Sequence, residues 1–378
     1  MESLQKRMQE HRRHLHKIPE LGFDLPKTYD YVKQTMRSLG YQTTRVAEHG
    51  LIAFKEGKRA QTIAFRADMD ALNIDEQNNV DFTSKHPGCM HACGHDGHMA
   101  MLLGFAEHIK DKETDKTIMF IFEPAEETYG GAKVIVDDGW FDSQYIENIF
   151  ALHLMPELDE GKIGINEGIM TAQDGDFDMK ITGINAHGTQ PHLGSDVALA
   201  ASALTMQYHT ILGRSNDPLR PGSINIGTMN LGEGRNIIAH EAFLTGSIRA
   251  FDHETFTHLK NRMRQIDHGI ETAYNVTINN DITDLHPPVH NDKQLFSTLK
   301  DSLQADEYTL MEPQMLAEDF SYYQQKVPGL FIMLGSKNIP LGYTAPLHSN
   351  QFNFDEAVLM KGVEILDHIA RLFGAIKE

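Results

Sequence analysis

An α/β fold is predicted, with a mainly parallel sheet in a larger domain and an inserted ferredoxin-like α+β domain. The chain of 378 residues exceeds the ~250–300 residues at which a single hydrophobic core stops growing, so two domains are expected. Continuous apolar runs such as IMFIF and IFALHL alternate with helical patterns, which is typical of parallel strands covered on both faces. From about Gly175 the strands alternate between polar and apolar residues instead. Their order with the helices is then β-α-β-β-α-β.

The elements of the first part of the chain follow the α/β rhythm. A charged amphipathic helix opens the chain, and a second helix is expected near residues 28–39. The next expected elements are, in order, the strands LIAFKEG and TIAFRADMD, the helix GHMAMLLGFAEHI, the strand TIMFIFEPAEE, the helix GAKVIVDDGW and the strand NIFALHL. We assign these elements to the larger domain.

The inserted domain is expected over residues 175–287. Its elements are the strand FDMKITGI, the helix VALAASALTMQYHTIL, the strands GSINIGTMN and EAFLTGSIRA, the helix HETFTHLKNRMRQIDHGIETAY and the strand NVTINNDI. After Pro287-Pro288 the α/β rhythm resumes with a helix near residues 293–303, the strand LFIMLG and a final helix from Asp355. The larger domain is therefore expected to be discontinuous, with residues 1–174 and 288–378.

Composition narrows the class of partner. The formal net charge of −19 disfavours nucleic acid and anionic membranes, because both would be repelled, so a small molecule is expected. The N-terminus lacks the apolar core of a signal peptide and no run approaches a membrane span, so we expect a cytoplasmic protein. Cys89 and Cys93 are the two cysteines. In a reducing compartment, cysteines clustered with histidines more often indicate a metal than a disulfide.

Side chains that can bind metals follow several expected strands. In chain order they are Asp68 and Asp70 in RADMD, Cys93 and His95 in CMHACGHDGHM, Glu126 and Glu127 in FEPAEE, His153 in ALHL, and His348 in PLHSN. Parallel strands project such residues from one edge of the sheet. Taken singly, each has an ordinary interpretation as a satisfied histidine, a helix start, a turn or a cap. Their coincidence favours a metal site, with His91 and His98 as packing neighbours.

The mixture of ligand types indicates a borderline transition metal and hydrolytic chemistry. Cysteine, histidine and glutamate suit Zn, Mn, Co or Ni better than Mg or Ca. Of two adjacent glutamates, one can bind a metal while the other takes a proton from a metal-activated water and passes it to a leaving amine. The spacing is not that of a zinc finger, because no second Cys/His pair lies at the expected distance from Cys89 and Cys93.

A set of motifs resembles a known family. They are HRRHLHKIPELGF, RADMDAL, MHACGHDGHM, EPAEE, NAHGTQPH, GSIRAFD and AEDFSYY. Together they resemble the metal-dependent amidohydrolases that include hippurate hydrolase, indole-3-acetyl-amino-acid hydrolases, N-acyl-amino-acid aminoacylases and N-acetyldiaminopimelate deacetylase, within the superfamily of carboxypeptidase G and aminoacylase. The resemblance implies hydrolysis of the amide bond of N-acyl L-amino acids, with an acetyl or aromatic acyl group.

The resemblance also implies the roles of residues in the larger domain. It implies two divalent metal ions per subunit (Mn, Zn, Co or Ni), with Glu126 as general base. The implied metal ligands are Cys93, His95, Glu127, His153 and His348. Asp70 matches an acid that orients the site. Asp68 stands where other branches place a metal-binding histidine, so it is a weaker candidate ligand.

For the inserted domain, the resemblance implies a lid and dimerisation domain in a homodimer or homotetramer. His187 matches a histidine that polarises the scissile carbonyl, in several relatives from the partner subunit. Asn236 and Arg249 match positions that hold the substrate carboxylate. As ordinary residues they would be a turn residue and a charge on a strand surface.

Three other functions remain open at this point. A dipeptidase or exopeptidase of the same superfamily would use the same site, and so would an N-acetyldiaminopimelate deacetylase. A protein that only stores or binds metal would use the ligands and would not need Glu126, because a closed structural site has four protein ligands and no base.

Overall fold

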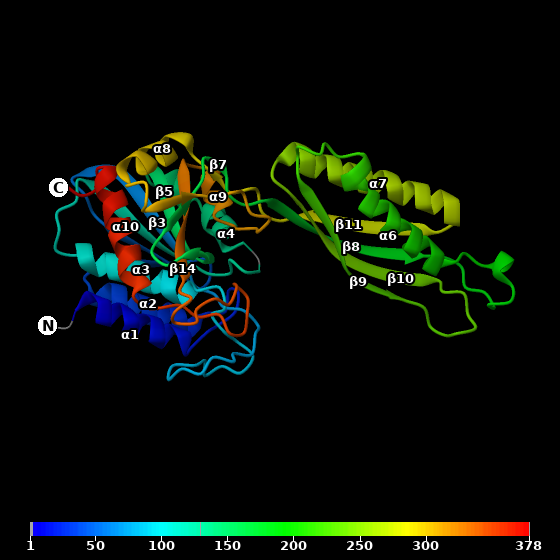
Figure 1. Ribbon diagram of the computed structural model, residues 1–378, viewed down its shortest axis with the longest axis horizontal. Coiled ribbons are helices and arrows are strands. Elements are labelled where there is room, and N and C mark those ends of the chain that lie inside the picture. The colour runs from blue at the N-terminus through cyan, green and yellow to red at the C-terminus, as the bar shows by residue number, and fades with distance from the viewer. Residues whose placement is uncertain (1–2, 129, 378) are drawn as a thin grey trace. The chain divides into compact units, whose positions relative to one another are not determined.

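The computed structural model describes residues 3–128 and 130–377, and the chain forms two compact units (Figure 1). The larger unit contains Met1–Met170, Val289–Glu312 and Asp319–Glu378. The smaller unit contains Thr171–Pro288 and Pro313–Glu318. The segment Pro313–Glu318 was not expected in the inserted domain, and it joins that unit through a β-bridge between Thr171 and Gln314.

The larger unit is built around an eight-stranded sheet in the order β1-β2-β4-β3-β5-β14-β6-β13. Its strands are β1 (Gln42–Val46), β2 (Gly50–Lys55), β3 (Arg59–Asp68), β4 (Lys116–Glu123), β5 (Ile146–Asp159), β6 (Ile163–Ile165), β13 (Tyr308–Leu310) and β14 (Gly329–Lys337). The four central strands β4, β3, β5 and β14 are parallel neighbours. This confirms the mainly parallel α/β fold class.

Helices cover both faces of this sheet. They are α1 (Leu4–His16), α2 (Pro26–Ser38), α3 (His95–Ile109), α4 (Gly131–Asp137), α5 (Trp140–Ser143), α8 (Lys293–Ser302), α9 (Ser321–Gln324) and α10 (Val358–Leu372). Neighbouring residues of a strand point into different cores. Phe65 belongs to a core with residues of α1, α2, α3, α8 and α10, and Ala64 belongs to a core with residues of α4, α5 and α9. Figure 1 shows α1, α2, α3 and α10 together on one side. The central strands are therefore apolar throughout, as the sequence indicated.

The smaller unit is a four-stranded antiparallel sheet with two helices. Its elements are β8 (Gln173–Thr182), α6 (Val197–Arg214), β9 (Gly222–Leu231), β10 (Glu241–Ala250), α7 (His253–Tyr274) and β11 (Thr277–Asp284). The sheet order is β11-β8-β10-β9, which is the arrangement of the expected ferredoxin-like module. Both helices pack on one face around Phe177, Leu204 and Leu244, so this unit has a hydrophobic core of its own.

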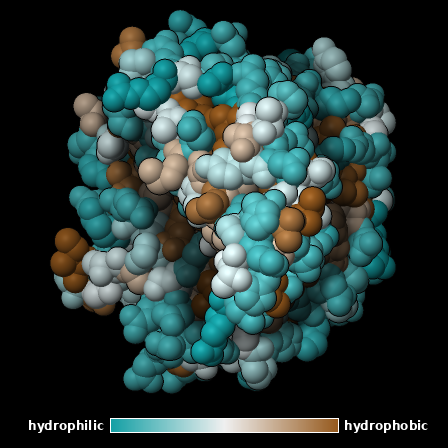
Figure 2. Space-filling view, turned by 90° about the vertical axis from the view of Figure 1, so that its right-hand side faces the viewer, coloured by the Kyte–Doolittle hydropathy of each residue, from teal (hydrophilic) through white to brown (hydrophobic). Residues whose placement is uncertain are grey.

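The remaining strands and the 3₁₀ helix are short. The pair β7 (Gly168–Ile169) and β12 (His290–Asn291) forms a two-stranded sheet, and η1 (Pro191–Leu193) is a single 3₁₀ turn. None of the helices in the described part of the chain is long and apolar enough to cross a membrane. On the face in Figure 2, hydrophilic side chains cover most of the surface and hydrophobic ones form small separate groups. Exposed apolar residues of the smaller unit include Leu199, Met206 and Leu231.

Candidate metal centre

The larger unit brings the expected metal ligands together beside its central parallel strands. His153 lies within β5, and Cys93 and His95 lie at the start of α3. Glu127 follows β4 by four residues, and His348 lies in the loop after β14. Because these strands are parallel neighbours, their carboxyl ends meet at one edge of the sheet.

The distances among these side chains are those of one cluster. Ligand atoms of Cys93, His95 and Glu127 all lie within 4.8 Å of one another. The Sγ atom of Cys93 is 3.5 Å from His153 Nε2, and His348 Nε2 is 3.4 Å from Glu127 Oε1. All five residues predicted as ligands therefore lie in one cluster, in which His348 is exposed and the other four are buried or half-buried.

Hydrogen bonds orient two of the histidines for metal binding. His95 Nδ1 donates to the carbonyl oxygen of Asp70 at 2.9 Å, and His153 Nδ1 donates to the carbonyl oxygen of Leu154 at 2.8 Å. The Nε2 lone pair of each ring then faces the cluster. His95 Nε2 is buried and has no hydrogen-bond partner among the described residues. A buried polar atom is rarely left unpaired, so this atom fits a metal ligand.

Asp70 holds the turn that carries both glutamates. Its Oδ1 accepts the backbone N–H of Glu126 at 3.1 Å and its Oδ2 accepts that of Glu127 at 3.0 Å. The preceding residue, Ala125, has a φ of 60°, a left-handed conformation that persists in a non-glycine residue only when its surroundings hold it. Gly131 starts α4 so close to this turn that an added Cβ would lie 1.7 Å from the Pro124 carbonyl oxygen. The glutamates therefore sit on a fixed backbone.

Glu126 lies beside the residues predicted as ligands. Its Oε2 is 4.0 Å from His95 Nε2, while Glu127 Oε1 is 3.8 Å from the same nitrogen. Two adjacent carboxylates thus approach the same point from one turn. The arrangement allows Glu127 to bind a cation while Glu126 exchanges a proton with a water molecule.

Asp68 and His98 lie within the cluster but have their polar atoms engaged. Asp68 Oδ1 accepts from His98 Nδ1 at 2.7 Å, and Oδ2 accepts from Arg66 Nη1 at 2.7 Å. His98 Nε2 accepts the backbone N–H of Leu154 at 2.9 Å. The contacts of Asp68 fit a residue that orients the site better than a ligand. His98 is a packing neighbour, as expected.

A group of charged residues that was not expected from the sequence lies behind Asp68. Arg66 is buried in β3 and donates from Nε and Nη2 to the two oxygens of Glu123, each at 2.9 Å. Its Nη2 also donates to Asp319 Oδ1 at 3.0 Å, and the Tyr323 hydroxyl donates to Glu123 at 2.6 Å. The available signal was an arginine and a glutamate in otherwise apolar strands, since such charges are rarely buried unless paired.

The pKa values of the ligands reflect burial beside several carboxylates. Burial, with the charges of Glu127 and Glu126, raises the pKa of Cys93 well above its usual value. Burial lowers the pKa of His153 to about 3, so its ring is neutral at pH 7. For His95, burial alone would lower the pKa, but Asp68 and Asp70 raise it to about 10. A divalent cation would reverse the preferences of the thiol and of His95, because ligands bind in their deprotonated forms.

Two predicted residues of the smaller unit lie side by side, and the third lies elsewhere. His187 is exposed and its Nδ1 is 2.7 Å from Thr189 Oγ1. Asn236 is its neighbour, since the Asn236 carbonyl accepts the N–H of Gly188 at 2.9 Å. Arg249 lies near the other end of β10 and donates to the Met315 carbonyl at 2.6 Å. The eight residue steps from Glu241 to Arg249 span about 27 Å of strand, so Arg249 lies toward the opposite end of β10 from Asn236.

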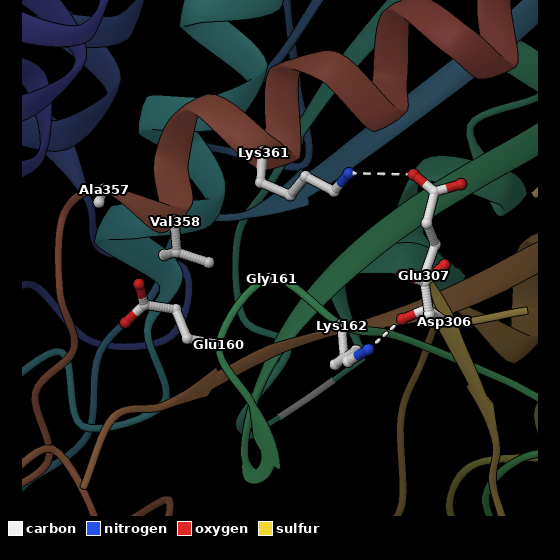
Figure 3. Close-up of a pocket in the computed structure, with 8 residues that line it drawn as sticks. All are labelled: Glu160, Gly161, Lys162, Asp306, Glu307, Ala357, Val358 and Lys361. Atoms are coloured by element: carbon white, nitrogen blue, oxygen red, sulfur yellow. Dashed lines mark hydrogen bonds and ion pairs between the residues drawn. The ribbon is translucent and has the colours of Figure 1, made fainter. Parts of the chain in front are cut away.

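A separate cavity of about 340 Å³ in the larger unit does not include these ligands. Figure 3 shows Lys162 and Lys361 on its wall, each directed toward an acceptor. Lys162 donates to the carbonyl oxygen of Asp306, and Lys361 Nζ is 3.6 Å from Glu307 Oε1. Because its cations are already paired, this cavity is a weaker candidate site than the ligand cluster.

Known proteins resemble the chain over nearly its whole length. Residues 64–372 match the family described as peptidase family M20/M25/M40. An uncharacterized hydrolase of Staphylococcus epidermidis is 35% identical over 374 residues, which cover 97% of this chain and 98% of that protein. The structure of the Bacillus subtilis YXEP protein, a dinuclear metal-binding peptidase from the M20 family, is 28% identical, has a TM-score of 0.83 and covers 98% of both chains. The aminobenzoyl-glutamate utilization protein of Klebsiella pneumoniae shares the fold, with a TM-score of 0.72, 21% identity, and coverage of 97% of this chain and 96% of that one.

Proposed function

Since the chain belongs to peptidase family M20/M25/M40, a family of metal-dependent hydrolases, we propose that it hydrolyses the amide bond of N-acyl L-amino acids. The products are a carboxylic acid and the free amino acid. The observation that carries this proposal is the position of Glu126, whose carboxylate lies 4.0 Å from a buried His95 nitrogen that has no hydrogen-bond partner among the described residues. A storage site would have no use for a carboxylate held at that place.

Five residues would hold two divalent ions in this proposal. They are Cys93, His95, Glu127, His153 and His348. The similarity to a dinuclear metal-binding peptidase supports two ions, and the mixture of ligands suits Mn, Zn, Co or Ni. When bound, such ions act as Lewis acids and lower the pKa of water from 15.7 toward ~7.

In this proposal one side chain transfers the proton and others hold the site in position. Glu126 takes the proton from the attacking water and delivers it to the nitrogen of the leaving amine. Asp70 keeps Glu126 and Glu127 in place through their backbone N–H groups. Asp68 and His98 hold each other and the N–H of Leu154, the residue after His153.

We also propose that the enzyme is a homodimer or homotetramer in which His187 and Asn236 act on the partner subunit's substrate. Arg249 would bind the substrate carboxylate. Two observations support this division. Roughly 27 Å of strand separates Arg249 from Glu241 at the start of β10, and Asn236 lies before that start. In addition, β9 is an edge strand of the sheet, and α6 exposes Leu199 and Met206, so this unit offers a surface on which a second copy could pair.

Complementation tests the shared site directly. In a co-expressed pair of Glu126→Gln and His187→Ala chains, a mixed dimer has one site with an intact Glu126 and an intact partner histidine. We expect activity in the mixed dimer and very little in either variant alone. If the mixed dimer stays inactive while remaining dimeric, His187 does not act across subunits.

A substrate panel separates the proposed activity from its alternatives. The metal-reconstituted protein is assayed with N-acetyl, N-benzoyl and N-succinyl amino acids, with N-acetyldiaminopimelate and with dipeptides. We expect kcat/KM to be highest for an N-acyl amino acid that has no free α-amino group. Preference for dipeptides would indicate an exopeptidase, and preference for N-acetyldiaminopimelate would indicate that deacetylase.

We further propose a cytoplasmic location. Cys93 and Cys89 are free cysteines, and Cys93 serves as a ligand only if it stays reduced. A reducing compartment meets that condition.

A further inference from the structure

A buried arginine in α1 contacts the segment that carries His95. Arg12 is 1% exposed, which is rare for an arginine. Its Nε donates to Asp96 Oδ2 at 3.2 Å, and Asp96 directly follows His95 in α3. The same carboxylate oxygen accepts from His16 Nδ1 at 2.8 Å. Two residues of α1 therefore hold the first turn of α3.

The same arginine contacts the loop that carries His348. Its Nη2 donates to Asn353 Oδ1 at 2.5 Å, and its Nη1 donates to the carbonyl oxygen of Phe354 at 3.2 Å. These two residues follow His348 by five and six positions. A guanidinium group offers several donors in one rigid plane. Arg12 can therefore fix the distance between the two ligand-bearing segments.

Packing of the Phe354 ring reinforces this connection. The guanidinium carbon of Arg12 is 3.6 Å from the centre of the ring, a cation–π contact. On α3, Gly97 leaves room for the ring, since an added Cβ there would lie 2.6 Å from Phe354 Cζ. The ring thus contacts both Arg12 and the helix that begins at His95.

The loop with His348 needs such external support. His348 has a φ of 62° and its side chain is 52% exposed. A left-handed non-glycine residue is strained and keeps its conformation only when neighbouring contacts hold it. One such contact is the hydrogen bond from His348 N to the Ala92 carbonyl at 2.9 Å. Arg12 supplies others further along the loop.

We propose that Arg12 is a positioning residue of the metal centre, which sets the spacing between His95 and His348 without touching metal or substrate. This inference rests on the proposed function, because it takes both histidines as ligands. Stability alone is a poor reason for the arrangement. Burying a charge carries a large desolvation cost, and a well-packed apolar residue often stabilises a core equally well.

The test compares Mn²⁺ affinity among folded variants. Arg12→Lys keeps the charge but loses the planar fork. Asn353→Ala leaves Arg12 and Asp96 intact and removes the Oδ1 atom that accepts from both Arg12 Nη2 and the Phe354 N–H. We expect both to bind Mn²⁺ roughly 10–100-fold more weakly, as is usual when residues behind metal ligands are replaced. Calorimetric titration gives the affinity, and circular dichroism verifies that each variant is folded at the assay temperature. Excess Mn²⁺ should restore most of the lost activity.

Arg13→Met is the matched control. Arg13 also pairs with Glu356, at 2.6 Å, but its side chain is 48% exposed, so we expect wild-type Mn²⁺ affinity. If Arg12→Lys and Asn353→Ala are folded and bind Mn²⁺ as tightly as the wild type, the positioning role is wrong. If the wild type itself binds no Mn²⁺, Zn²⁺ or Co²⁺, the proposed metal centre fails and this inference fails with it. Should Arg12→Lys not fold, Asn353→Ala alone decides.

Discussion

Asp70 connects two parts of the proposed site, because its carboxylate holds the backbone of both glutamates while its carbonyl oxygen orients His95. Burial raises the pKa of Asp70, yet two backbone N–H donors point at its oxygens. Asp70 therefore contacts the backbone of the proposed base and orients two of the proposed ligands.

Replacing Asp70 with asparagine should impair the enzyme without unfolding it. The amide nitrogen cannot accept a hydrogen bond, so one of the two N–H groups of the glutamate turn loses its partner. We expect kcat/KM to fall roughly 10–100-fold, with a weaker affinity for metal. Steady-state kinetics and metal analysis measure both quantities. Asp75→Asn, at an exposed position of the same segment, is the control, and equal losses in the two variants would contradict the assigned role.

At the scale of single residues, the clustering of the proposed ligands was predictable and the residues behind them were not. Cys93, His95 and Glu127 stand out because residues of these types recur at strand ends, a local pattern. Arg66 and Asp319 contact each other across 253 positions of sequence, and no local pattern indicates such a pair. The same applies to Arg12 and Asn353, which are 341 positions apart.

Among the elements, α1 has a role that its amphipathic pattern did not reveal. Besides burying Met8 and Leu15, it places His16 between two carboxylates, with Nδ1 at 2.8 Å from Asp96 and Nε2 at 3.0 Å from Glu76. Burial alone would lower the pKa of His16, but the charge of Asp96 and both hydrogen bonds raise it to about 9. The histidine is therefore charged in the folded protein at pH 7.

This contact predicts a pH-dependent contribution to stability. With a folded pKa of about 9 and an unfolded value near 6.5, the contribution is complete below about pH 6.5 and is lost as the pH rises through about 9. Its size is on the order of 3 kcal/mol, since each pKa unit corresponds to about 1.4 kcal/mol. Denaturant unfolding at pH 6 and at pH 9.5 gives the free energy of unfolding of the wild type and of His16→Gln. The difference between the two proteins at each pH measures the contribution of His16. A difference that is the same at both pH values would rule out this role of His16.

Long elements were predictable, whereas short ones were not. We expected the strands β3, β4, β5 and β14 from their apolar runs, and the helix α7 from its hydrophobic period. Among the described residues, five strands were missed, β1, β6, β7, β12 and β13, which have two to five residues each. In β1 and β13 most side chains are polar or exposed. Their conformation depends on pairing with neighbouring strands, for example β6 with β13, which is a tertiary effect.

At the scale of the whole molecule, the two units have separate hydrophobic cores. All the proposed metal ligands belong to the larger unit. Metal binding should therefore stabilise the larger unit alone, since a ligand stabilises only the structure that binds it.

Removing the metal with a chelator should therefore lower the temperature of one unfolding transition and leave the temperature of the other unchanged. Scanning calorimetry of the metal-loaded protein is compared with protein dialysed against a strong chelator. We expect two transitions, and chelation should lower the midpoint temperature of one of them. The shift corresponds to the loss of about 2.7 kcal/mol of unfolding free energy, the stabilisation supplied by metal at 100 times Kd. Activity should vanish and return with Mn²⁺, Co²⁺ or Zn²⁺. Full activity in verified metal-free protein would contradict the proposed chemistry.

The most direct test of the account is the Glu126→Gln variant, assayed for metal content and for hydrolysis in the same preparation. Glutamine keeps the shape of the side chain but cannot take a proton. We expect wild-type metal content, with kcat reduced by roughly 10²–10⁴-fold, the usual contribution of a general base. Unchanged hydrolysis in a fully metal-loaded Glu126→Gln protein would contradict it.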